Sequence, residues 1–213
     1  MNEEIREIFT IGHSTHSSEY FLELLQAHNI DTVIDVRSTP ASSYNPQFNK
    51  DTLQSFLKQN YIKYMHFGDE FGARQTDESI LDDEGCVDFE LFRKTYQFQS
   101  GIERVDIGIS KGFKIALMCA EGNPLECHRF SMISVYLEEI GITVKHILKD
   151  KSIILNKELE DELLKKYEKK IPVPTLFEPD VDKTEQLKNA YKLHNKEIGW
   201  RSGNSEQNVV RYD

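Results

Sequence analysis

Thiol, carboxyl, imidazole and guanidinium side chains gather in one short stretch near the middle of this chain. They follow an apolar segment, residues 115–118, which is typical of a buried strand. Enzymes use thiol, imidazole and carboxyl groups as nucleophiles and as general acids and bases. A reactive site is therefore the leading hypothesis for this stretch, whose candidate residues are Cys119, Glu121, His128 and Arg129.

Three residues around position 124 predict the start of a helix. Asn123 can cap a helix, Pro124 suits its first position, and Glu126 can reach back to the cap. We expect this helix to cover residues 124–140. Its amino terminus would carry unpaired N–H groups and a partial positive charge, which attract anions. The sequence thus predicts an anion near Gly122, just before the helix.

The two cysteines of this stretch are expected to differ in role. A helix terminus and Arg129 would both favour the thiolate of Cys119, which makes Cys119 the candidate nucleophile. Cys127 would share a helix face with Phe130, which favours packing in the core. Neighbouring residues on a helix point about 100° apart, so Cys127 and His128 are not expected to hold one metal ion together. The sequence therefore predicts no metal and no cofactor, with a metal site kept as an alternative.

Apolar runs alternate with segments of helical periodicity along the first 150 residues. This alternation predicts an α/β fold: a single domain with a mostly parallel, roughly five-stranded sheet flanked by helices, plus a C-terminal extension. In such a sheet, ligands bind at the carboxyl ends of the strands. The expected strands are residues 7–13, 32–37, 61–67, 114–119 and 143–148, and the expected helices are residues 17–28, 49–58, 124–140 and 156–170, with one or two more within 89–110.

Polar side chains also follow the first two expected strands. His13 and Ser14 follow the first strand, and Asp35, Arg37 and Ser38 mark the end of the second. Because the ends of parallel strands converge, we expect these residues to line one cleft with the cysteine stretch. Ordinary structural roles stay open, since Asp35 can cap a loop or pair with an arginine and His13 can bond to the backbone.

The 213 residues suffice for one core domain and an appendage. We expect residues 1–150 to form the α/β domain and residues 151–177 to form a charged helix and an extended segment that pack on it. Residues 178–213 are expected to be a weakly ordered tail with a short helix at residues 184–195.

Charge and composition narrow the range of partners. The net charge of −10 argues against a broadly basic surface, so nucleic acid is a less favoured partner than a small anionic ligand. The charged amino terminus does not read as a secretory signal, and no apolar run reaches membrane-spanning length. We therefore expect a cytoplasmic protein with no membrane partner, whose three cysteines stay as thiols. The sequence predicts no particular oligomeric state.

Several motifs, in order along the chain, resemble the Domain of Unknown Function 488 family. The resemblance covers about residues 7–150 and implies a single α/β domain whose polar motifs share one site. The motifs are Thr-Ile-Gly-His-Ser at residues 10–14, Val-Ile-Asp-Val-Arg-Ser at 33–38 with Pro40, Asn-Pro-Gln-Phe at 45–48, the segment 68–74, and Leu-Met-Cys-Ala-Glu at 117–121 followed by Pro124 and Cys-His-Arg at 127–129.

The chain departs from the family pattern at two places. Ala41 and Ser43 stand where relatives carry arginines, which would weaken a polyanionic ligand more than a small one. The Gly-Gly-Arg that often follows the third strand is Gly-Ala-Arg here, so Arg74 is kept and stays a candidate for ligand binding.

We expect a hydrolase or group transferase that acts on a small anionic or nucleotide-like ligand. Redox chemistry is disfavoured because no dinucleotide-binding glycine pattern follows the first strand. A noncatalytic sensor or adaptor that binds a ligand or a nucleic-acid end is the alternative, and rhodanese-like thiol chemistry at Cys119 or a metal site is a further one. The candidate catalytic residues are His13, Asp35, Cys119 and Glu121, and the candidate ligand-binding residues are Ser14, Arg37, Ser38, Arg74, Gly122, His128 and Arg129.

Overall fold

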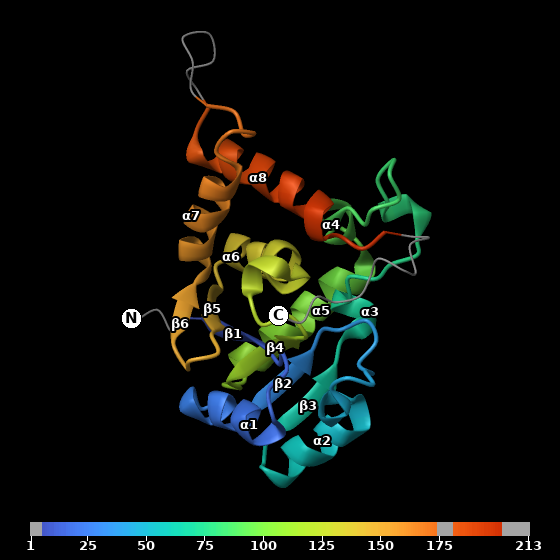
Figure 1. The fold of residues 1–213 in the computed structure, drawn as a ribbon, viewed down its shortest axis with the longest axis vertical. Helices are drawn as coiled ribbons and strands as arrows, with labels where there is room; N and C mark the ends of the chain where they lie inside the picture. Colours follow the sequence, from blue (N-terminus) through green and yellow to red (C-terminus); the bar gives the residue numbers. More distant parts are fainter. Residues whose placement is uncertain (1–5, 174–180, 202–213) are drawn as a thin grey trace.

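Within residues 6–173 and 181–201, the part of the chain that the computed structural model describes, six strands form one sheet (Figure 1). Their order across the sheet is β3-β2-β4-β1-β5-β6, and all neighbouring pairs are parallel except β5 with β6. The predicted α/β class with a mostly parallel sheet is confirmed, whereas β6 was not predicted. The strands are β1 (Glu7–Gly12), β2 (Thr32–Asp35), β3 (Lys63–His66), β4 (Ile115–Cys119), β5 (Thr143–Ile147) and β6 (Ile153–Leu155).

Helices follow the strands in the alternation that the sequence predicts. The cap predicted at Ser17 is present, since its side chain accepts a hydrogen bond from the backbone N–H of Tyr20 at 3.2 Å. The α-helices of the described residues are α1 (Ser18–Ala27), α2 (Lys50–Gln59), α3 (Gly68–Phe71), α4 (Phe89–Phe92), α5 (Tyr96–Ser110), α6 (Val135–Glu139), α7 (Asn156–Tyr167) and α8 (Lys183–Ile198). Shorter helical turns are η1 (Pro46–Phe48), η2 (Glu78–Ile80), η3 (Pro124–Glu126) and the π-helical η4 (Arg129–Ser134).

Side chains of the central strands alternate between two cores, as the period of a strand requires. Ile8 of β1 and Leu117 of β4 pack with the apolar residues of α5, η4 and α6. Their neighbours Phe9 and Met118 pack with those of α1 and α2 on the opposite face. Figure 1 shows α1 and α2 on one side of the sheet and α6 on the other. Burial on both faces explains the continuous apolar runs of these strands.

The segment predicted as one helix over residues 124–140 is broken into η3, η4 and α6. Asn123 does cap η3, because its side chain accepts from the N–H of Leu125 at 3.0 Å. Cys127 then adopts an extended conformation, with φ −130° and ψ 139°, and the helical path resumes only at His128.

The break has a physical reason in the contacts of the buried Arg129 side chain. Its guanidinium reaches back and donates to the carbonyl oxygens of Glu121 and Gly122, at 2.6 and 3.0 Å. Cys127, two residues before Arg129, is extended and turns the chain so that this contact forms. The prediction of a continuous helix from position 124 is therefore wrong, and the helix dipole expected beside Gly122 is reduced to that of one short turn.

The chain after β5 packs on the sheet layer through α7 and α8. Leu159, Leu163 and Ala190 form an apolar cluster with Phe130 of η4, and Figure 1 shows α7 and α8 beside α6. The helix predicted at residues 184–195 corresponds to α8. The expected extended stretch at 171–177 lies mostly outside the described residues, and the proposed division into domain, packed segment and tail stays a prediction. Among the described residues, no helix combines the length and apolar character needed to cross a bilayer.

Candidate functional site

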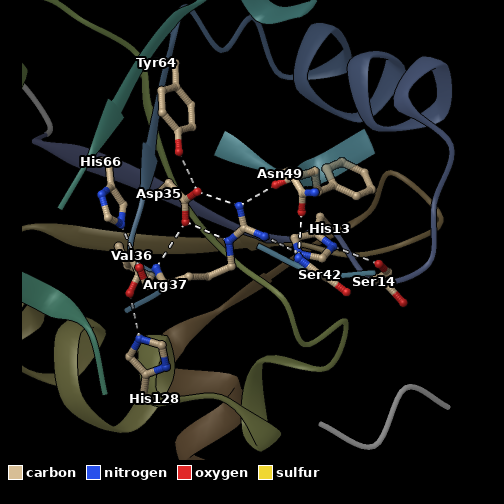
Figure 2. Close-up of polar contacts among 11 residues, drawn as sticks. His13, Ser14, Asp35, Val36, Arg37, Ser42, Asn49, Tyr64, His66 and His128 are labelled. Carbon is tan, nitrogen blue, oxygen red and sulfur yellow. Dashed lines mark hydrogen bonds and ion pairs between the residues drawn. The ribbon is translucent and has the colours of Figure 1, made fainter. Parts of the chain in front are cut away.

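The imidazole of His128 lies between two thiols. Its Nδ1 is 3.7 Å from Sγ of Cys119 and 3.8 Å from Sγ of Cys127. Its Nε2 lies 3.3 Å from the carbonyl oxygen of Val36, a contact that Figure 2 also shows. Because a carbonyl oxygen only accepts, Nε2 carries a hydrogen. Nδ1 is therefore the ring nitrogen that shares a proton with the thiols.

The carboxyl group of Glu121 joins these three residues, and together the four are called the thiol cluster here. One potential ligand atom from each of Cys119, Glu121, Cys127 and His128 lies within 4.8 Å of all the others. The side chains are shielded from solvent, with exposed fractions of 2% for Cys119, 1% for Cys127 and 9% for His128. The buried Oε2 atom of Glu121 has no hydrogen-bond partner among the described residues.

Burial and neighbouring charges shift the pKa values of the thiol cluster in different directions. Burial, with the Cys127 thiol, raises the pKa of Glu121 to about 7. Burial also raises the pKa of Cys119 well above its usual range. For Cys127, burial is outweighed by the hydrogen bond with Cys119 and the charges of Arg129 and His128, so its pKa falls. These effects favour the thiolate form at Cys127 over Cys119, and Cys127 also packs in the buried core, as the sequence predicted.

Arg129 is fully buried beside this cluster and holds the loop that carries Glu121. In addition to the two carbonyl contacts, its Nε donates to Oγ1 of Thr10 at 3.3 Å. The guanidinium thus uses its donors on the protein's own backbone and on β1. Gly122, the other ligand-binding candidate in this loop, is exposed, and its carbonyl is one of these acceptors.

A second group, the aspartate network, consists of His13, Asp35, Arg37 and Tyr64 (Figure 2). Arg37 donates from Nε to Oδ1 of Asp35 at 2.8 Å and from Nη2 to Oδ2 at 2.6 Å, which is the strong bidentate geometry. The hydroxyl of Tyr64 donates to the same Oδ2 at 2.7 Å. Asp35 is fully buried, so these donors replace the water that its carboxylate loses.

His13 completes the network as a neutral imidazole. Its Nε2 accepts from Nη1 of Arg37 at 3.0 Å, and its Nδ1 donates to the carbonyl oxygen of Ser14 at 2.8 Å. Burial, reinforced by the charge of Arg37, lowers the pKa of His13 from 6.5 to about 3. The ring also stacks on Phe48, with 4.3 Å between centroids. His13 is thus held in one orientation and one protonation state at neutral pH.

The two groups adjoin at the ends of β1, β2 and β4. The N–H of His13 donates to the carbonyl oxygen of Cys119, and the N–H of Val36 to that of Met118, both at 2.9 Å. The same Val36 residue accepts from His128 through its own carbonyl. Strand-end residues that are far apart in sequence are therefore brought together, as the convergence of parallel strands predicts.

Three candidates, Ser14, Ser38 and Arg74, are members of neither group. The backbone N–H of Arg74 donates to Oγ of Ser38 at 2.9 Å, which ties the loop after α3 to the end of β2. Among the described residues, no hydrogen bond joins the exposed Arg74 guanidinium to either group. Ser14 has a positive φ of 47°, and Gly122 lies beside it.

Tyr64 is the site residue that sequence reasoning missed. It lies on β3, where it pairs in register with Val33 of β2. The sequence does show a tyrosine in the third predicted strand, whose hydroxyl could reach a neighbouring carboxylate. It does not show that this strand lies beside the one that ends in Asp35, because the pairing of the strands is known only from the assembled sheet. Burial and the charge of Asp35 raise the pKa of Tyr64, so the phenol stays protonated and donates.

A hollow of about 330 Å³ opens beside the Glu121 loop, at the carboxyl ends of β1 and β5. This volume is within the range of small-molecule sites, about 300–1,000 Å³. A larger hollow of about 970 Å³ lies between α4, α6 and α8, but none of the candidate residues lines it, so the smaller one is the more relevant. The smaller hollow is lined by Gly12, Ser14, His16, Leu24, Gly122, Asn123, Pro124, Ile147, Leu148, Lys149 and Asp150.

Fold and site together define an α/β protein with a mostly parallel sheet and a cluster of cysteine, histidine and carboxylate residues near its central strand ends. The chain belongs to the family described as Domain of unknown function DUF488, whose sequence model matches residues 17–137, more than half of the chain. The resemblance seen in the sequence is thus confirmed. The match includes the thiol cluster and Asp35 but begins after His13 and Ser14. Comparisons with curated proteins and with solved structures gave no match.

Proposed function

We propose that this protein is a hydrolase or group transferase that acts on a small anionic ligand, with the thiol cluster as its reaction centre. The observation that carries the proposal is the convergence of two thiols, an imidazole and a carboxyl group within 4.8 Å. Unlike the groups of the aspartate network, they leave a carboxylate oxygen without a partner among the described residues. Groups that can exchange protons, and are not saturated by the protein, suit acid–base catalysis.

In this reaction Glu121 would be the group that moves the proton. Glu121 directly precedes Gly122, which lines the hollow, and a carboxylate within reach of the ligand can accept a proton from an attacking water molecule and return it to the leaving group. His128 and Cys127 would lie next to the reacting atoms, with the ring orientation fixed by the Val36 carbonyl. Arg129 would act as a positioning residue, because it holds the Glu121 backbone.

The aspartate network would have a positioning role in this proposal. The side chains of His13, Asp35 and Arg37 are bonded mainly to one another, so a reaction at Asp35 would first have to break a buried ion pair. Arg37 also donates to the carbonyl oxygen of Phe48, which joins the end of β2 to η1. The network thereby fixes the strand end that carries Val36, the acceptor for His128.

The ligand would occupy the hollow beside Gly122. Lys149 and His16 supply nitrogen groups to its lining, whereas Arg37 and Arg129 are engaged within the protein. We keep the small anionic ligand that the sequence suggested, with Lys149 as its positively charged partner; Asp150 also lines the hollow and limits the excess of positive charge there. We place this activity in the cytoplasm, where reducing conditions keep the thiols available.

Thiol chemistry is the second candidate function. The distance of 3.8 Å between Nδ1 of His128 and Sγ of Cys127 is compatible with a thiolate–imidazolium pair that attacks a substrate directly. Sγ of Cys119 lies 3.7 Å from the same Nδ1, so either cysteine could be the nucleophile in that mechanism.

The test is to incubate the protein with a small-molecule extract of cells and to follow consumption by mass spectrometry. Wild-type protein should consume at least one anionic compound, and Glu121→Gln should be slower by about 10²–10⁴-fold, the usual contribution of a general acid or base. The matched control is Cys86→Ala, a buried cysteine outside the cluster, which should keep full activity. Lys149→Glu should raise KM with little change in kcat.

Two results would count against the proposal. Consumption that is unchanged in Glu121→Gln would place the reaction elsewhere. A compound that binds wild-type protein but is never converted would favour the noncatalytic sensor or adaptor.

A further inference from the structure

We infer that Cys119, Glu121, Cys127 and His128 form a binding site for one divalent, thiophilic metal ion of the zinc class. Each of these side chains offers one sulfur, nitrogen or oxygen atom, and the four atoms converge within 4.8 Å. Thiolate, imidazole and carboxylate are the ligands that zinc takes in proteins, usually four at a time.

The distances within the cluster match the edges of a tetrahedral zinc site. Bonds of about 2.3 Å to sulfur and about 2.0–2.1 Å to nitrogen place the two ligand atoms about 3.6 Å apart at the tetrahedral angle. Nδ1 of His128 lies 3.7 Å from Sγ of Cys119 and 3.8 Å from Sγ of Cys127. These two sulfur–nitrogen distances are therefore within a few tenths of an ångström of the required length, and the other pairs of ligand atoms lie within 4.8 Å of one another.

The unpartnered oxygen of Glu121 is an independent observation that points to a cation. The large majority of buried side-chain polar atoms in proteins have a hydrogen-bond partner, because burial without one is costly. Oε2 of Glu121 is buried and has none among the described residues. A metal ion at the centre of the cluster would supply the missing contact.

The surroundings of the cluster support its ligands in the way that metal sites require. A ligating histidine usually donates its second ring N–H to a backbone carbonyl, as Nε2 of His128 does towards Val36. The backbone N–H of Arg129 lies 3.4 Å from Sγ of Cys127, so it donates to the thiolate. Both contacts orient the ligand atoms towards one point.

Charge balance also favours a divalent ion. Two thiolates and one carboxylate exceed the charge of such an ion by one negative charge. The guanidinium of Arg129, fully buried next to the cluster, carries the compensating positive charge. A buried group of charges that sums to zero avoids the large cost of an uncompensated one.

The continuous helix from residue 124 that disfavoured a shared metal ion in the sequence does not form. On a continuous helix Cys127 and His128 would diverge, but Cys127 is extended, and both side chains face Cys119. A disulfide between the cysteines would instead leave Glu121 and Nδ1 of His128 without a role, so it explains less of the cluster.

The inference deepens the proposed function and, in its catalytic part, rests on it. A bound ion would supply Lewis acidity and would lower the pKa of a water molecule bound to it. This requires that the Glu121 carboxylate gives up its coordination position to the water. Binding of the ion is measured without a substrate, so the inference and the proposed function can fail separately. Coordination to the metal would lower the nucleophilicity of the thiolates, which would make the thiol candidate less favourable.

The experiment uses the full chain, purified without a histidine tag under reducing conditions. After dialysis against metal-free buffer it should retain about one equivalent of zinc by mass spectrometry. Cobalt(II) titrated into protein freed of metal should give a near-ultraviolet sulfur-to-cobalt band and visible tetrahedral bands that saturate at one equivalent. The variants Cys119→Ser and Cys127→Ser should lose affinity by more than the roughly 10–100-fold that removal of a supporting contact costs.

Cys86→Ala is the matched control, because Cys86 is a buried free cysteine outside the cluster and should leave the cobalt spectrum unchanged. Circular dichroism separates loss of binding from loss of fold, and Glu121→Gln, which keeps the side-chain volume, should weaken binding without unfolding the protein. The inference is overturned if folded, reduced wild-type protein binds far less than one equivalent and shows no sulfur-to-cobalt band. It is equally overturned if the double variant of Cys119 and Cys127 binds as wild type does.

Discussion

Replacement of Arg129 by methionine tests whether this side chain holds the reactive loop or binds a ligand. Methionine fills part of the same buried space but cannot donate hydrogen bonds. The change removes the donors for the carbonyl oxygens of Glu121 and Gly122, at 2.6 and 3.0 Å, and the longer contact to Thr10. We therefore expect Arg129→Met to destabilise the protein.

The size of the effect follows from these contacts. Hydrogen bonds to charged groups contribute about 1.5–3 kcal/mol each, which gives about 3–6 kcal/mol for the two short ones. Water can replace the bond to the exposed Gly122, and removal of a buried charge returns part of its desolvation cost. We expect a net loss of about 2–4 kcal/mol in the free energy of unfolding, which lowers Tm by about 5–12 °C in a protein of this size.

The assay is urea unfolding followed by circular dichroism, with Arg6→Met as the control. Arg6 pairs with Asp106 at the surface, so its loss should cost less than about 1 kcal/mol. An equally small cost for Arg129→Met would refute the loop-holding role. The sequence-based anion hypothesis predicts that result, with a phosphate-specific rise in Tm, relative to chloride at equal ionic strength, that the variant loses.

Three further predictions concern stability. Burial holds the pKa of His13 and of His146 near 3, below the unfolded value of 6.5, so the unfolded chain binds more protons as pH falls. The free energy of unfolding should therefore drop between pH 6.5 and pH 3, by up to about 1.4 kcal/mol per pH unit for each histidine. A midpoint of urea unfolding that does not change over this pH range would contradict the buried, neutral state of both histidines. Asp35→Asn should lower the free energy of unfolding by about 3–5 kcal/mol, because it leaves the buried Arg37 charge unpaired. Tyr64→Phe removes one hydrogen bond to Asp35 and should cost only about 1–2 kcal/mol. Similar losses in both variants would contradict the central role of the ion pair. Removal of the chain after residue 177 should lower Tm, because α8 packs on α7 and η4. An unchanged Tm would instead support the weakly ordered tail predicted from the sequence.

The sheet was predictable because its signals are local and repeated. Buried strands such as 115–119 read as continuous apolar runs, and Ser17 marks a helix start by its own chemistry. The convergence of His13, Asp35 and Arg37 followed from the geometry of parallel strands alone. These features depend on periodicity and strand direction, which the sequence displays directly.

The break at Cys127 could not be predicted in the same way. The capping signals at Asn123 and Pro124 describe how a helical turn begins, but they do not set its length. Here the turn ends after three residues, and the long-range contacts of Arg129 accompany the break. The geometry of the thiol cluster depends on that break. The sequence therefore disfavoured a metal site, and the four potential ligand atoms come together only in the folded chain.

β6 and Tyr64 illustrate a second limit. A strand of three residues has too few positions to show a period, and β6 is identified by its pairing with β5. Tyr64 acquires its role from a neighbour on another strand, Asp35, at 2.7 Å. Both features are set by register between segments, which one sequence does not specify.

X-ray absorption at the zinc edge, on the wild-type protein loaded with one equivalent of zinc, tests most directly whether the four residues of the thiol cluster form one centre. The expected first shell contains two sulfur atoms at about 2.3 Å and two nitrogen or oxygen atoms at about 2.0–2.2 Å. In the Cys127→Ser variant one sulfur should be lost, and in Cys86→Ala the shell should stay unchanged. A shell made only of nitrogen and oxygen would show that the ion binds elsewhere, and would contradict a single centre built from Cys119, Glu121, Cys127 and His128.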